Sequence, residues 1–82
     1  MSRREITTPV PGVFYRRADP TSDPFKVEGD DVQEGETIGV VEIMKNFQAV
    51  ESEAAGRLVE FLVENEDAVN AGQAIAVIEV QE

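Results

Sequence analysis

The 82-residue chain contains no cysteine, no histidine and no tryptophan. Without cysteine it can form neither a disulfide nor a thiolate metal site. Without histidine it lacks the commonest general base, the usual imidazole metal ligand and the base of a Ser-His or Cys-His pair. Its many carboxylates look like a solvated surface, with no pair singled out for acid–base work. We therefore expect no metal, no catalytic residues and no enzymatic activity of its own.

Positive charge is scarce as well. Lys and Arg number 7 against 17 Asp and Glu, and the formal net charge is −10. Because nucleic acids and anionic membranes are bound by clustered Lys and Arg, neither is an expected partner. No apolar run approaches the roughly 18 residues of a spanning helix, and the N-terminus lacks the apolar core of a signal peptide. The default expectation is a soluble cytoplasmic protein.

What the sequence does contain is an internal repeat. The segment KVEGDDVQEGETIGVVE, residues 26–42, resembles LVENEDAVNAGQAIAVIE, residues 62–79. Matching positions such as Gly35 and Gly72 lie 37 residues apart. Each copy has a V-x-x-G turn followed by an apolar strand, so the sequence predicts a duplicated β unit.

The upstream part of the repeat has a different spacing. Gly12 and Gly56 open similar segments, PGVFYRR and AGRLVEF, but lie 44 residues apart, so the first copy carries about seven extra residues. The excess is ADPTSDP, residues 18–24, in which two prolines stand among Asp, Ser and Thr. Such residues form turns, and because Pro20 and Pro24 lack an amide hydrogen the segment cannot be the interior of a strand. They predict a protruding loop inserted into one half of the duplicated unit.

The remaining sequence favours strands throughout. The apolar segments are rich in Val and Ile, and none has a long 3.6-residue period. We predict one all-β domain over residues 1–82, a small sandwich or barrel. Its glycines are expected to be scaffold, Gly35 and Gly72 with positive φ in turns, Gly12 and Gly56 where strands pass closely. The expected strands are residues 13–17, 37–43, 46–52, 57–63 and 74–80.

The segment GVVEIMKNFQAVES, residues 39–52, joins the two copies and is typical of a β-hairpin. Its tip lies at Met44-Lys45 or at Lys45-Asn46, and the tolerance of Asn for left-handed geometry slightly favours the second. Tight hairpin turns favour Asn-Gly, Asp-Gly or Gly-Gly, so Met and Lys break a local rule here. Such breaks tend to mark functional sites. An exposed Lys at a tip is also an ordinary solubilising residue, and the residues alone leave both interpretations open.

Glu42, Met44 and Lys45 match a known attachment motif, usually Ala-Met-Lys-Met preceded by Glu. The chain also has TPVPGVFYR near its start, V-x-x-G-E-T before the motif and E-x-E-A-A-G-R-L after it. From about Thr8 to Val80 it resembles the biotinyl/lipoyl attachment family, and within it the biotin carboxyl carrier domain of bacterial acetyl-CoA carboxylase. Lipoyl domains share that fold but typically have Asp-Lys-Ala at the tip and no inserted loop.

The resemblance implies a flattened β-barrel, or barrel-sandwich hybrid, of two four-stranded sheets related by pseudo-twofold symmetry. The hairpin of residues 42–47 would carry the modification, and residues 1–7 are expected to be flexible. Residues 18–24 would form the family's "thumb", packed over a tethered ring. The thumb residues that would contact it are Asp19, Thr21, Ser22 and Asp23.

The resemblance also implies a function. Lys45 would be joined to biotin by a biotin–protein ligase, with Glu42, Met44 and Asn46 beside it. The biotin would carry carboxylate between a biotin carboxylase and a carboxyltransferase of an acetyl-CoA carboxylase-like system, in malonyl-CoA and fatty acid synthesis. Ile43 replaces the usual Ala of the motif, and Asn46 the usual second Met. Two alternatives stay open: a lipoyl carrier of a 2-oxoacid dehydrogenase, and an unmodified structural or adaptor module of the same fold.

Overall fold

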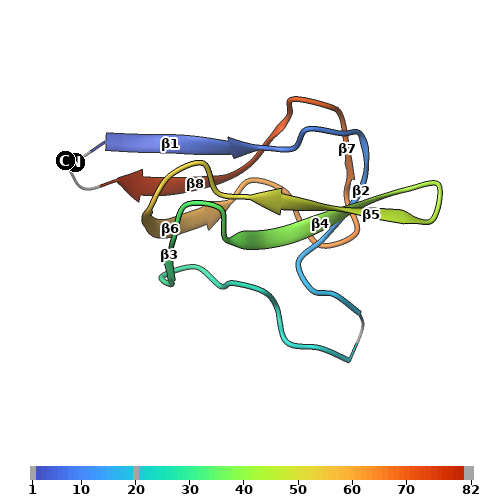
Figure 1. Ribbon diagram of the computed structural model, residues 1–82, viewed down its shortest axis with the longest axis horizontal. Coiled ribbons are helices and arrows are strands. Elements are labelled where there is room, and N and C mark those ends of the chain that lie inside the picture. Colours follow the sequence, from blue (N-terminus) through green and yellow to red (C-terminus); the bar gives the residue numbers. More distant parts are fainter. Residues whose placement is uncertain (1, 20, 81–82) are drawn as a thin grey trace.

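The computed structural model describes residues 2–19 and 21–80, and the regular structure in these ranges is all β (Figure 1). The strands pair antiparallel in two four-stranded sheets, with orders β1-β8-β6-β3 and β5-β4-β2-β7. No membrane-spanning helix is found in the described part of the chain. The strands are β1 (Ser2–Thr7), β2 (Gly12–Tyr15), β3 (Asp31–Val32), β4 (Thr37–Ile43), β5 (Asn46–Glu51), β6 (Gly56–Phe61), β7 (Ala68–Val69) and β8 (Ala74–Val80).

The two sheets correspond strand for strand. Adding four to each strand number of the sheet β1-β8-β6-β3, and counting from β8 on to β1, gives the order of the other sheet, β5-β4-β2-β7. The central strands β4 and β8 have the same burial pattern over all seven residues. The predicted pair of four-stranded sheets and their pseudo-twofold relation are therefore confirmed, and the 37-residue repeat is its sequence counterpart.

The core lies between the sheets and is made by alternate residues of the strands, as the two-residue period of a strand requires. Phe14 of β2 is its largest fully buried side chain and lies against Gly39 of β4. A Cβ atom on Gly39 would come within 2.5 Å of the Phe14 ring. The other buried apolar residues are Ile6, Val32, Ile38, Val41, Val50, Leu58, Val69, Ile75, Ala76 and Ile78.

Two glycines occupy equivalent points where strands pass closely. A Cβ atom on Gly12 would lie 2.2 Å from the carbonyl oxygen of Glu42, and one on Gly56 would lie 2.3 Å from that of Glu79. No side chain fits at either point, which confirms the predicted role of both glycines. The predicted positive φ of two turn glycines is also found, at 83° and 81° for Gly35 and Gly72.

The N-terminal segment differs from the expectation. Residues 1–7 were expected to be flexible, but Ser2–Thr7 forms β1, paired with β8, and Met1 lies outside the described residues. The segment SRREIT has one buried residue, Ile6, and pairs along its length with β8. The two-residue strands β3 and β7 are too short to show any alternation.

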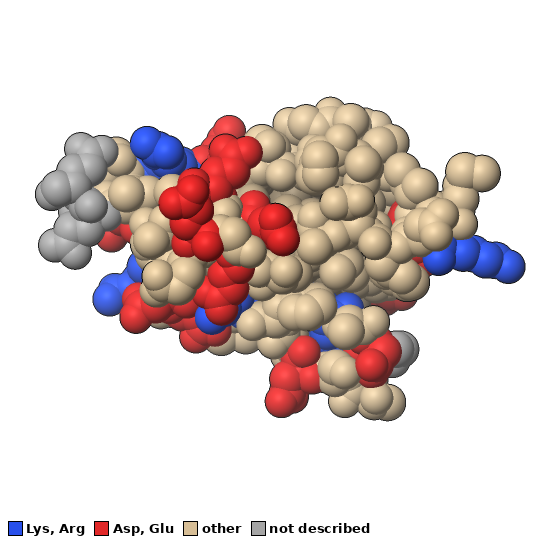
Figure 2. All heavy atoms as spheres, in the orientation of Figure 1, with Lys and Arg blue, Asp and Glu red and all other residues tan. Residues whose placement is uncertain are grey.

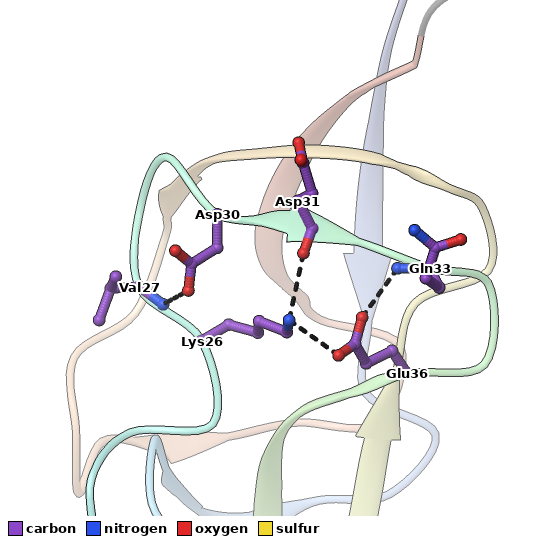
Figure 3. A network of polar contacts seen from close by, with 6 residues as sticks. All are labelled: Lys26, Val27, Asp30, Asp31, Gln33 and Glu36. Carbon is purple, nitrogen blue, oxygen red and sulfur yellow. Dashed lines mark hydrogen bonds and ion pairs between the residues drawn. The ribbon is translucent and has the colours of Figure 1, made fainter.

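A polar network holds the chain between the inserted loop and β4 (Figure 3). The Lys26 ammonium lies 2.8 Å from Glu36 Oε2 and donates a 3.1 Å hydrogen bond to the carbonyl oxygen of Asp31. The other carboxylate oxygen of Glu36 accepts a 2.9 Å bond from the Gln33 N–H. One lysine thus ties β3 to the start of β4.

Candidate functional site

The β4–β5 hairpin forms one end of a body whose longest extent is 39 Å (Figure 1). Ile43 pairs with Asn46, so the turn residues are Met44 and Lys45 and not the slightly favoured Lys45-Asn46. Their φ angles are 49° and 69°, the left-handed values of a type I′ turn. Each residue with a side chain costs about 1–2 kcal/mol in this conformation. The turn therefore gives up stability to place an exposed Met and an exposed Lys at the tip.

The surroundings of the tip are poor in charge. Lys45 is the only charged residue between Ile43 and Val50. In Figure 2 the Asp and Glu side chains gather toward the end away from the hairpin and on the projecting loop, whereas the area over β2, β5 and β7 is largely uncharged. Met44 is 90% exposed. The Lys45 amine is thus presented on a neutral, partly apolar surface.

A groove of about 360 Å³ lies beside the base of the hairpin. The Tyr15 hydroxyl donates a 3.1 Å hydrogen bond to Glu42 Oε1, and this bond is the main cause of a raised Tyr15 pKa. The Tyr15 and Phe47 rings lie 6.3 Å apart. Glu42 and Phe47 face each other one pair below Ile43–Asn46, so the groove begins close to the tip. Its lining residues are Tyr15, Arg17, Ala18, Asp19, Glu42, Phe47, Asn65 and Glu66.

The inserted loop is organised by Asp19. Asp19 Oδ1 accepts hydrogen bonds from the Thr21 hydroxyl (2.7 Å) and N–H (2.9 Å), and Oδ2 accepts one from the Ser22 hydroxyl (2.9 Å). The bonds from Thr21, then those from Ser22, lower the Asp19 pKa. Of the predicted thumb residues, Asp19 alone lines the groove; Thr21 and Ser22 bond within the loop, and Asp23 is exposed outside the groove.

The neck of this loop is fixed to the rest of the domain. Arg16 accepts a 2.9 Å backbone bond from Phe25, and its own N–H donates a 2.8 Å bond to Asn65 Oδ1. The Arg16 guanidinium lies over the Phe61 ring, 4.2 Å from its centroid, a cation–π contact. The loop therefore projects beside the groove from a firmly bonded base.

Sequence reasoning named only Asp19 and Glu42 among the lining residues as site residues. It missed the other six: Tyr15, Arg17, Ala18, Phe47, Asn65 and Glu66. One sequence signal for Glu66 was present, because the repeat matches it to Gly29. In the structure both residues have left-handed φ angles, 74° for Glu66 and 99° for Gly29. Strained residues concentrate at functional sites. Glu66 thus has a carboxylate where the other copy has glycine, and it lines the groove.

No group of three or more Asp, Glu, His or Cys side chains suited to a metal is found among the described residues. The aromatic walls and scattered polar edges of the groove suit a small, flat organic group, since ligand sites combine apolar walls with a few polar groups.

Comparisons with known proteins agree on one family. Residues 4–78 match the sequence family described as "Biotin-requiring enzyme". The biotin carboxyl carrier protein of acetyl-CoA carboxylase from Streptococcus pyogenes is 37% identical over 85% of this chain and 42% of its own. The protein of the same name from Pseudomonas aeruginosa is 37% identical over 89% of this chain and 47% of its own. The chain thus spans less than half the length of these curated relatives.

A solved structure supports the fold. The crystal structure of the Kluyveromyces lactis urea carboxylase matches with a TM-score of 0.80 at 26% sequence identity. The match covers 96% of this chain and 6% of that one. The arrangement of sheets and hairpin therefore occurs within a much larger protein.

Proposed function

The chain belongs to the biotin-requiring enzyme family, and on that premise we propose that it is a biotin carboxyl carrier domain with Lys45 as the attachment point. The observation that carries the proposal is the turn. Met44 and Lys45 occupy left-handed positions that Asn-Gly would fill at lower cost, at the end of a two-stranded projection. Met44 and Lys45, which are unusual residues for such a turn, coincide with the family's attachment motif.

The chemistry at Lys45 requires a base from outside the domain. An amine forms an amide bond only in its neutral form, and a free Lys has a pKa of about 10.4. No Asp or Glu lies in residues 43–50, and the chain has no histidine. We propose that a biotin–protein ligase supplies the base while the domain supplies an unobstructed amine. Acylation at Nζ removes one positive charge.

When bound, biotin supplies a site for reversible carboxylation, and we propose that this chain delivers it to a biotin carboxylase and a carboxyltransferase. The names of the relatives support an acetyl-CoA carboxylase-like system. We propose that this system serves malonyl-CoA and fatty acid synthesis in the cytoplasm. Tethering raises the effective concentration of the group at both partners. The domain itself would act as a carrier without catalysis.

We further propose that the groove beside the hairpin is the resting place of the tethered ring. Tyr15 and Phe47 offer apolar walls, and the Glu42 and Asp19 carboxylates lie at its edge as hydrogen-bond acceptors. A flat bicyclic ring with N–H donors fits that combination. The family's thumb contact would then run through Asp19, with Thr21 and Ser22 holding the Asp19 carboxylate in place.

Intact-mass spectrometry after reaction with a biotin–protein ligase, ATP and biotin tests the proposal. We expect one biotinyl group per chain, none on Lys45→Arg and one on Lys26→Arg. The last variant is a matched control because Lys26 and Lys45 are the only lysines. No adduct, or an adduct that persists in Lys45→Arg, would contradict the proposal. A lipoyl group on protein from its own host would identify a lipoyl carrier instead.

A further inference from the structure

The two sheets have equivalent edge strands with opposite chemistry. β1 lies beside β8 as β5 lies beside β4, and Glu79 of β8 matches Glu42 of β4 in the repeat. The pairing registers therefore place residues 3–5 of β1 (Arg, Arg, Glu) at the positions of residues 47–49 of β5 (Phe, Gln, Ala). Charged side chains on an edge oppose pairing with another chain. β1 carries this protection and β5 does not.

The outer side of β5 has backbone groups available for pairing. In a two-residue hairpin Ile43 and Asn46 form a hydrogen-bonded pair, and the alternation of the ladder turns the N–H and C=O of Phe47 and Ala49 away from β4. Within residues 2–19 and 21–80, no backbone bond outside the strand ladders reaches residues 46–51. Phe47 is also 59% exposed. β5 thus presents two donors, two acceptors and an aromatic ring.

A second hollow, of about 270 Å³, lies along the far half of β5. Glu51 and Glu53 line it, and neither forms an ion pair within the described part of the chain. Its other lining residues are Thr7, Pro9, Gln48, Ala49 and Ser52. A groove with two free carboxylates at the end of an open edge strand suits a cationic segment that continues a paired strand.

We propose that β5 is the interface of a two-fold dimer of this chain, in which β5 strands pair antiparallel about Gln48. Phe47 of one copy then opposes Ala49 of the other, and their outward N–H and C=O groups bond in pairs. In the same register Lys45 opposes Glu51. The hairpin tip of each copy enters the Glu51–Glu53 groove of its partner, and a shift by two residues loses this charge match.

A second copy is the occupant because the edge is complementary to itself. The run from Lys45 to Glu51 begins with a cation and ends with an anion, so the two-fold axis brings opposite charges together at both ends. The net charge of −10 opposes association, but residues 43–50 contain no carboxylate and the Debye length is about 8 Å at physiological salt. We expect a weak dimer, with a Kd on the order of 100 µM, because the interface is small.

Sedimentation equilibrium of the unmodified 82-residue chain, up to about 1 mM, tests the dimer. Ala49→Glu gives β5 the charge that Glu5 gives β1 and should weaken association at least about tenfold. Ala68→Glu adds the same charge to the opposite edge strand of the same sheet and should leave the Kd unchanged. A chain that stays monomeric at every concentration refutes the proposal. This holds also if the monomer pairs with a strand of another protein. Equal association of Ala49→Glu also refutes it.

The register has its own test. Lys45→Glu and Glu51→Lys should each weaken the dimer severalfold, and the double exchange should restore it, because it re-forms both ion pairs with the charges reversed. A double variant as weak as the singles overturns this register. The unmodified protein is used throughout, so the result does not depend on whether Lys45 accepts biotin. If it does, loss of its charge on acylation should favour the monomer.

Discussion

Replacing Met44-Lys45 by Asn-Gly should stabilise the domain while removing the proposed attachment point, Lys45. Both residues have left-handed φ values, each costing about 1–2 kcal/mol for a residue with a side chain. Asn-Gly is the pair that a type I′ turn prefers. The conformational entropy that Gly loses on folding offsets about 0.5–1 kcal/mol of the gain. Met44 is 90% exposed, so little packing is lost. The net gain should be about 1–2 kcal/mol.

Thermal unfolding followed by circular dichroism measures this gain, since 1 kcal/mol raises the Tm of a domain of this size by about 4–8 °C. Met44→Ala is the matched control. It removes the exposed thioether but keeps a Cβ atom at a φ of 49°, so its stability should stay within about 0.5 kcal/mol. An unchanged or lower Tm for Asn-Gly, or an equal gain for Met44→Ala, would show that the turn stores no strain.

Gly39→Ala should destabilise the domain by about 1–3 kcal/mol in urea unfolding, because its Cβ would meet the Phe14 ring and the core resists overpacking; unchanged stability would show that the sheets move apart freely. The Lys26–Glu36 ion pair, at 2.8 Å, lowers the Glu36 pKa and raises that of Lys26. Its stabilisation should therefore disappear as the pH falls through the lowered Glu36 pKa, and again as it rises through the raised Lys26 pKa. Lys26→Met should flatten both changes in a plot of Tm against pH, and an unaltered plot would contradict the pairing.

The repeat made much of the fold predictable. Positions 37 residues apart have the same surroundings, as the identical burial patterns of β4 and β8 show, so one copy's assignment supports the other. The edges were harder, because β1 is anchored by Ile6 alone and its other residues are polar or charged. Hydrophobic alternation reports contact with a core, and an edge strand held by its backbone need not show it.

The site was predictable only where it is continuous in sequence. Met44 and Lys45 could be recognised because motif and turn coincide in adjacent residues. The groove could not, since Tyr15, Phe47 and Glu66 come from separate segments that the sheet order and the β6–β7 connection bring together. The composition of residues 18–24 indicated a polar loop but not that Thr21 and Ser22 would bond to Asp19.

The pairing of Ser2 with Val80 sets the mechanical reach of Lys45. This pair lies at the opposite end of the molecule from the hairpin (Figure 1). Any polypeptide attached to either strand end would hold the domain by that pole, leaving most of the 39 Å body between the anchor and the amine. Pivoting at the anchor would then sweep Lys45 through an arc whose radius is set by the folded body, so the β-sheets act as a stiff extension of any tether.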